Sequence, residues 1–313
     1  MKKILVIGAT GAQGGGVARA LLTRGEFAVK AMTRNPESKE ALVLSEQGAE
    51  ICRANLDDID SLIAAMEDVY GVFGITNFWE VLSVEREKQQ AQNIALAAKQ
   101  AGVKHVIWST LEDTRSYIPK DFTGMPMLEE VYRVPHLDAK NETNAYFVDV
   151  PTTYLITSFF WDNLINFGMC PKQNTNGSYD YVMPFDDKLL AGHVAEDIGK
   201  AVSPMFEQPD RFINKTVGIQ TDALTLAQMS QIIAEELGVT VNYIPVDADT
   251  FRSFPFDGAE EIGNNFQYFR DFNEAFLSLR SKALMHELNP EAMSFREYVR
   301  TNKDLIKTIM DSA

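Results

Sequence analysis

Apolar and polar positions along the first half of the chain switch repeatedly between strand and helix periods. Residues 4–7 form an uninterrupted apolar run, which predicts a strand buried on both faces. Residues 14–24 then carry an apolar stripe at helical spacing. Repetition of this order is typical of parallel βαβ units. Strands are predicted at residues 4–7, 28–32, 50–53, 70–75, 105–109 and 153–157, and helices at 14–24, 83–100 and 135–148, with shorter helices beginning near Pro36 and Asp57.

The pattern as a whole predicts an α/β fold, with a Rossmann-type doubly wound parallel sheet and a smaller α/β C-terminal portion. The Rossmann domain is expected to span residues 1–155, and the smaller portion, on the substrate or partner side, residues 156–313. A helix at about 194–206 is expected to return to the main sheet, whereas residues 216–244 are assigned to the smaller unit. One terminal helix is predicted for 294–310.

Residues 111–135 fit neither period. The segment contains Pro119, Pro126, Pro135 and Gly124, so we expect a long loop over the strand ends, with a helix opening at Pro135. Long loops in compact domains are often functional. If the protein responds to a ligand, this loop is the element that we expect to become ordered.

A glycine-rich segment, GATGAQG at residues 8–14, follows the first predicted strand and opens the first predicted helix. Glycines allow a sharp turn and a close approach to a pyrophosphate, and the helix N-terminus presents free N–H groups to the anion. The alternative is a tight structural turn without a ligand. The predicted phosphate-binding residues are Gly8, Thr10, Gly11, Ala12, Gln13 and Gly14.

The end of the second strand indicates which dinucleotide is bound. An acidic residue there would bind the adenosine ribose and repel a 2′-phosphate, but this chain has Arg34 and Asn35. A guanidinium suits a phosphate by charge and by geometry, and Ser38 or Lys39 could assist. The sequence therefore predicts NADP(H) rather than NAD(H) as cofactor, the alternative for Arg34 being an ordinary solvated arginine.

Charge and cysteine content narrow the function classes. The formal net charge is −15, which disfavours direct binding of DNA or RNA. Cys52 and Cys170 are far apart and suggest a reducing compartment, and no apolar stretch is long enough to span a membrane. We expect a cytoplasmic protein without a membrane partner. The four histidines are scattered without ligand spacing, so no metal site is expected.

Several motifs together resemble the NmrA-like family of atypical short-chain dehydrogenase/reductase proteins, and are most similar to the HSCARG-type branch of NADPH sensors. The resemblance covers nearly the whole chain. It rests on residues 8–14, 33–36 (TRNP), 76–80 (TNFWE), 136–140 (HLDAK) and 160–164 (FWDNL).

The resemblance implies a row of residues along the cofactor, at the carboxyl ends of the strands. For Phe160 and the neighbouring Trp161, the alternative is an ordinary place in the core. The row consists of Asn55 and Leu56 by the adenine, Thr76, Asn77 and Phe78 in the crevice after the fourth strand, Lys88 from the next helix, Lys140 at the nicotinamide ribose, and Phe160 and Asn163 at the nicotinamide end.

The catalytic pair of the wider superfamily is incomplete. Its enzymes use Tyr-x-x-x-Lys, in which the lysine activates the tyrosine for proton transfer. Lys140 is present, but His136 stands four residues before it. His136 and Lys140 are therefore the candidate catalytic residues, against the alternative that the histidine makes a structural hydrogen bond. Tyr132 could enter the site from the loop.

Two functions remain open. The missing tyrosine and the resemblance favour a sensor of NADPH and NADP, acting through a regulatory protein partner and possibly as a homodimer. The alternative is an NADPH-dependent reductase of a small apolar carbonyl, enone or quinone, for which the cofactor supplies the hydride.

Overall fold

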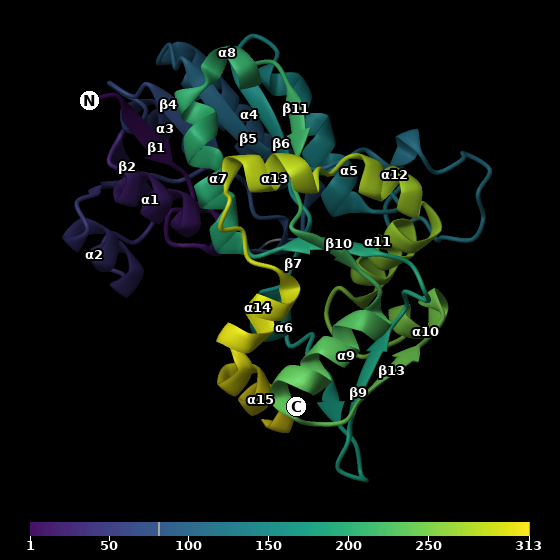
Figure 1. The fold of residues 1–313 in the computed structure, drawn as a ribbon. Helices are drawn as coiled ribbons and strands as arrows, with labels where there is room; N and C mark the ends of the chain where they lie inside the picture. The colour runs from purple at the N-terminus through teal and green to yellow at the C-terminus, as the bar shows by residue number, and fades with distance from the viewer. Residues whose placement is uncertain (81, 313) are drawn as a thin grey trace.

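A seven-stranded parallel sheet forms the centre of the computed structural model, which describes residues 1–80 and 82–312 (Figure 1). Strand order is β11-β6-β5-β4-β1-β2-β3, so the order reverses between β1 and β4. In such sheets the ligand crevice lies at the carboxyl ends of the strands at this reversal. The predicted doubly wound α/β fold is confirmed. The strands are β1 (Lys3–Val6), β2 (Ala28–Thr33), β3 (Glu50–Arg53), β4 (Gly71–Gly74), β5 (His105–Thr110), β6 (Thr152–Ile156) and β11 (Thr216–Gly218).

Helices cover both faces of this sheet because alternate strand residues point to opposite sides. Ile4 and Val6 pack into one apolar cluster with helices α1 (Ala12–Arg24), α7 (Ala195–Glu207) and α13 (Lys282–Leu288). Leu5 and Ile7 pack into the other. The second cluster is closed by α3 (Ile59–Ala65), α4 (Val84–Gln100) and the 3-10 helix η3 (Thr143–Phe147), and the remaining helices beside the sheet are α2 (Lys39–Glu46), α5 (Pro135–Glu142) and α8 (Pro209–Phe212).

Glycine is required at two close approaches around α1. A Cβ on Gly14 would lie 2.3 Å from the carbonyl oxygen of Gly8, so the helix start could not sit this close to the β1 turn with any side chain there. A Cβ on Gly199 would lie 2.1 Å from the carbonyl oxygen of Gly16. These contacts set the spacing of α1 from both the phosphate loop and α7.

A second lobe lies below the sheet in the view of Figure 1, with the C-terminus at its far end. It contains two three-stranded sheets, ordered β12-β10-β7 and β13-β9-β8, around one large apolar cluster. Its strands are β7 (Phe159–Phe160), β8 (Lys172–Gln173), β9 (Tyr179–Met183), β10 (Leu190–His193), β12 (Asp222–Leu224) and β13 (Val241–Pro245). Its helices are α6 (Asn163–Asn166), α9 (Leu226–Leu237), α10 (Ala248–Arg252), α11 (Ala259–Asp271), α12 (Asn273–Ser278), α14 (Phe295–Thr301) and α15 (Lys303–Ser312).

Four local predictions were wrong. Residues 216–218 form β11 of the main sheet rather than part of the smaller unit, because they pair with β6. The predicted terminal helix is two helices, α14 and α15, separated at Asn302. Pro36 precedes α2, whose N-cap is Ser38. Helix α3 is capped by Asp58 rather than Asp57, whose carboxylate pairs with Arg86.

Helix α7 covers nearly the same residues as the predicted returning helix and packs against α1. Within residues 1–80 and 82–312, no helix has both the length and the hydropathy needed to cross a membrane.

Candidate functional site

The phosphate loop leaves the start of α1 open. Gly8 has φ +67°, which favours glycine, and its carbonyl accepts a hydrogen bond of 2.9 Å from the N–H of Gly11. Gly11 is the N-cap of α1 and contributes no side-chain hydrogen bond to the helix. The first N–H groups of an α-helix have no partner within the helix, so this end has the donors and the dipole that an anion requires. Residues 8–14 therefore fit the pyrophosphate of a dinucleotide.

Two polar contacts connect the loop with its surroundings. The hydroxyl of Ser109, at the end of β5, donates a 2.9 Å hydrogen bond to the side-chain oxygen of Gln13. Thr10 lines a small cavity of about 190 Å³ together with Lys39 of α2. Gln13 is thus held against β5, and an exposed lysine lies beside the loop.

Arg34 extends from the end of β2 into solvent, with 65% of its side chain exposed, and forms an ion pair with Glu80. The neighbouring polar side chains stabilise local turns. The side-chain oxygen of Asn35 accepts from the N–H of Glu37 at 3.2 Å, and Ser38 caps α2. Arg34 thus places a positive charge at this strand end, and its ion pair with Glu80 partly offsets that charge.

The predicted adenine-side residues also make local contacts. Asn55 follows β3, and its side-chain oxygen accepts from the N–H of Asp57 at 3.2 Å. The carbonyl of Leu56 accepts a 2.8 Å hydrogen bond from the side chain of Asn93 in α4. These contacts fix the loop after β3 at the carboxyl edge of the sheet.

Lys140 is buried and ion-paired. Its Nζ lies 2.6 Å from the carboxylate of Glu87 and 2.9 Å from the hydroxyl of Thr76, and the Thr76 hydroxyl donates to the same Glu87 oxygen at 2.7 Å. Glu87 is 1% exposed and Lys140 is 8% exposed. One charge pair therefore joins α5 and α4 to the segment that follows β4. Asn77 and Phe78 come directly after Thr76 in this segment.

His136 is held by a residue from the second lobe. Its Nδ1 and its backbone N–H both contact the same carboxylate oxygen of Glu261 in α11, the backbone contact at 2.9 Å. The imidazole lies 4.9 Å from the ring of Trp79 and 6.0 Å from that of Phe78, between ring centroids. His136 is therefore close to the β4 crevice but is engaged by a glutamate.

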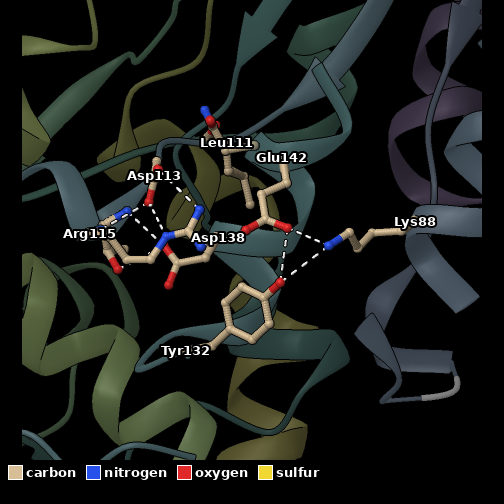
Figure 2. Close-up of polar contacts among 9 residues, drawn as sticks. Lys88, Leu111, Asp113, Arg115, Tyr132, Asp138 and Glu142 are labelled. Carbon is tan, nitrogen blue, oxygen red and sulfur yellow. Dashed lines mark hydrogen bonds and ion pairs between the residues drawn. The ribbon is translucent and has the colours of Figure 1, made fainter. Parts of the chain in front are cut away.

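Lys88 belongs to a polar network around Glu142 (Figure 2). Lys88 and Arg115 form ion pairs with this carboxylate, and the hydroxyl of Tyr132 donates to it at 2.9 Å. Burial would raise the pKa of Glu142, but its hydrogen bonds from Lys88, Arg115 and Tyr132 lower it. Burial, followed by the bond to Glu142, raises the pKa of Tyr132, so the phenol stays protonated rather than being activated by the nearby Lys88.

Asp138 fastens the start of the long loop from within α5. Its Oδ1 accepts from the N–H and the hydroxyl of Thr114 at 2.7 and 2.8 Å, whereas Oδ2 is buried without a hydrogen-bond partner among residues 1–80 and 82–312. Burial raises the pKa of Asp138 to about 6. From α11, Asn264 and Gln267 donate to carbonyls of Pro126, Arg133 and Gly124. The loop is thus held at both sides by the chain's own side chains.

The nicotinamide-end candidates lie on the first elements after β6. The half-buried Phe160 ring in β7 is 5.2 Å from the ring of His193, and Asn163 is the first residue of α6. A separate cavity of about 490 Å³ opens beside Phe78 and Pro135, and helix α11 and the residues before it form its other wall. Phe78 and Pro135 adjoin the Thr76 and His136 positions, so this cavity borders the crevice, whereas Phe160 and Asn163 do not line it.

Sequence reasoning missed the carboxylates. Four of the cationic or imidazole candidates have a glutamate partner whose role the sequence analysis did not predict. Glu142 could have been found two residues after Lys140, and Glu87 lies on the predicted helix after the fourth strand. Glu261 follows its partner by 125 residues and had no signal. The partners are Glu80 for Arg34, Glu87 for Lys140, Glu142 for Lys88 and Glu261 for His136.

Replacing Lys140 by methionine is expected to lower the free energy of unfolding by roughly 3–5 kcal/mol, because Glu87 is left charged and buried without its partner. Lys99→Met, at an exposed pair with Asp149, is expected to cost less than about 1 kcal/mol. The double variant Lys140→Met/Glu87→Leu should recover much of the loss. Urea unfolding measures all three, and equal small losses for both lysines would contradict the buried pair.

Asp138→Asn is expected to change how stability depends on pH. The folded pKa of about 6 lies above the ordinary 3.8, so wild-type stability falls as pH rises between these values. The variant lacks this loss and should gain up to about 3 kcal/mol on wild type between pH 4 and 7. Asp149→Asn, at a carboxyl whose pKa Lys99 lowers, should show no such gain. The free energy of unfolding is measured with urea at each pH. A difference between Asp138→Asn and wild type that is the same at every pH would refute the burial effect.

Comparison with known proteins places this geometry in one family. The model described as "NmrA-like family" matches residues 1–299. An NmrA-like family domain-containing protein of Dictyostelium discoideum is 25% identical over 307 residues, which cover 96% of this chain and 97% of that protein. An NmrA-like family domain-containing oxidoreductase of Aspergillus hancockii is 29% identical over 272 residues, covering 80% of this chain and 77% of that one.

A solved structure shares the fold. The negative transcriptional regulator NmrA, in complex with NADP, superimposes with a TM-score of 0.77 at 20% identity, covering 96% of this chain and 94% of the other. At this identity the likeness supports the architecture alone. With a family model that matches all but the last 14 residues, the chain belongs to the NmrA-like family.

Proposed function

We propose that this chain binds NADP(H) at the carboxyl edge of its parallel sheet and acts as an NADPH-dependent reductase of a small, largely apolar acceptor. The observation that carries the proposal is the cavity of about 490 Å³ bordering the crevice at Phe78 and Pro135. A volume of this size suits a small organic ligand. The name of the Aspergillus hancockii relative as an oxidoreductase agrees with it.

The residues present fit the dinucleotide. The uncapped start of α1 and the glycines at 8, 11 and 14 suit its pyrophosphate, and Arg34 with Lys39 suits a 2′-phosphate. When bound, the cofactor supplies the hydride. The chain's own residues orient it. Lys140 donates to Glu87 and to the carbonyl and hydroxyl of Thr76, so it would exchange one of these hydrogen bonds to hold a ribose hydroxyl.

A second candidate is a sensor of NADPH and NADP of the HSCARG type, which regulates a protein partner or a second copy of the chain. The observation that favours it is the engagement of every candidate proton donor. His136, Lys140 and Tyr132 each contact a glutamate carboxylate. If the loop 111–134 changes its conformation when the cofactor binds, its hydrogen bonds with Asp138 of α5 and with Asn264 and Gln267 of α11 would have to break.

Arg34→Ala is expected to weaken NADPH binding roughly tenfold or more while leaving NADH affinity nearly unchanged, because a charge-assisted contact to phosphate contributes about 1.5–3 kcal/mol. Arg211→Ala is the matched control, since Arg211 is also exposed and paired with a glutamate. Fluorescence titration of both cofactors measures the effect. Equal loss for NADPH and NADH would remove Arg34 from 2′-phosphate recognition.

Purified protein is expected to oxidise NADPH when it is given at least one member of a panel of quinones, enones, aldehydes and iminium ions. The loss of NADPH absorbance measures this oxidation. Tight NADPH binding without turnover of any class would defeat the reductase proposal. In that case, protection of residues 111–134 from protease by NADPH but not NADP⁺ would support the sensor.

A further inference from the structure

The carboxylate of Glu80 lies against the cation that is expected to bind the 2′-phosphate. Glu80 is the last residue of η1 (Phe78–Glu80), a short 3-10 helix after β4, and it forms an ion pair with Arg34, which directly follows β2. The two residues are 46 positions apart in the sequence. Among residues 1–80 and 82–312, neither side chain forms a hydrogen bond or ion pair with any other side chain. The fold thus brings an acidic group to the strand end whose charge distinguishes the two dinucleotides.

A carboxylate at this strand end has two effects on the choice of cofactor. It accepts hydrogen bonds from the adenosine ribose hydroxyls of NAD(H), and it repels the 2′-phosphate of NADP(H). The sequence places no acidic residue directly after β2, where Arg34 and Asn35 stand, but the fold supplies Glu80 from η1. Arg34 and Glu80 therefore favour opposite cofactors at the same place.

A second pair of arginine and carboxylate lies beside the first. Arg86 in α4 pairs with Asp57 at 2.7 Å, and Gln90 donates to the same carboxylate at 2.9 Å. The bond from Arg86 lowers the pKa of Asp57, and the positive charge of Arg34 adds to this effect. The bond to Asp57 raises the pKa of Arg86, and the negative charge of Glu80 adds to this effect. The two pairs therefore form one cluster of four charges.

The two carboxylates of this cluster differ in how they are held. Asp57 has partners of its own in Arg86 and Gln90, so it keeps both when Arg34 turns to another anion. Glu80 is held through Arg34, and 41% of its side chain is exposed. Exposed ion pairs contribute little to stability, so the Glu80 carboxylate can leave for water easily. A phosphate monoester carries up to about two negative charges and three acceptor oxygens, so it competes well with one carboxylate for a guanidinium.

We propose that Glu80 determines the preference between NADP(H) and NAD(H) by competing with the 2′-phosphate for Arg34, an inference that rests on the contact between Arg34 and the 2′-phosphate proposed above. Binding of NADP(H) breaks the pair of Arg34 and Glu80, whereas binding of NAD(H) leaves it intact. Only the phosphorylated cofactor therefore has to displace the carboxylate. Glu80 keeps the affinity for NADP(H) below the value that Arg34 alone would give.

Glu80→Gln tests the competition because it removes the charge and keeps the size of the side chain. Fluorescence titration measures the Kd of NADPH and NADH, and calorimetry measures that of adenosine 2′,5′-bisphosphate and ADP. The variant is expected to bind NADPH and the bisphosphate roughly fivefold more tightly, and NADH and ADP no more tightly than wild type. Glu287→Gln is the matched control, since Glu287 is also exposed and paired with an exposed arginine, Arg211.

The double variant Arg34→Ala/Glu80→Gln separates competition for Arg34 from repulsion of the phosphate at a distance. Competition requires Arg34, so in the Arg34→Ala background the loss of the Glu80 charge is expected to change the Kd of NADPH less than about twofold. Repulsion at a distance does not require Arg34 and would persist in that background. The titrations use about 0.15 M salt, at which the Debye length is about 8 Å, so that distant charges are screened.

A gain in affinity for NADPH and the bisphosphate alone, lost when Arg34 is absent, would support the proposal. Weaker binding of NADPH by Glu80→Gln would overturn it, because Glu80 would then position Arg34 for the phosphate. An unchanged affinity, an equal gain for NADPH and NADH, or an equal gain with and without Arg34 would overturn it as well. These results leave the 2′-phosphate contact intact as long as Arg34→Ala selectively weakens NADPH binding. If Arg34→Ala weakens NADPH and NADH equally, that contact fails and the competition fails with it.

Discussion

The buried pair of Lys140 and Glu87 is the interaction on which the site depends. Two opposite charges with almost no exposure are tolerated only when geometry and additional hydrogen bonds offset their desolvation, and Thr76 supplies such a bond to each. The three residues come from α5, α4 and the end of β4. Because each charge needs the other as its partner, the pair fixes the position of α5, which carries His136 and Asp138, relative to the sheet.

The same logic extends around the crevice. Arg34 and Lys88 also form ion pairs with glutamates, so these positive groups, which a dinucleotide would meet, are already partly neutralised, and His136 is hydrogen-bonded to Glu261. These contacts fix the position of each side chain, and they lower the net positive charge around it. In a chain of net charge −15, a dinucleotide depends strongly on the backbone N–H groups of α1, which no carboxylate side chain caps within the described residues.

The second lobe completes the site from a distance in sequence. Helix α11 supplies Glu261 to His136, holds the loop 111–134 through Asn264 and Gln267, and forms part of the cavity beside Phe78. One helix thus contacts the histidine, the loop and the cavity. A change in α11 would be felt at all three places.

The sequence alone determined the parallel sheet, the position of its phosphate loop and the family, because these follow from local apolar runs and from glycines within a few residues of one another. It located Arg34, His136 and Lys140, but it did not show that each of them contacts a glutamate. The glutamate partners, the joining of β11 to β6 and the cavity depend on contacts between segments far apart in the chain. A period or a motif can show where an acidic residue lies but not which cation it will pair with, since any of the 44 acidic residues could pair with a given cation until the chain has folded.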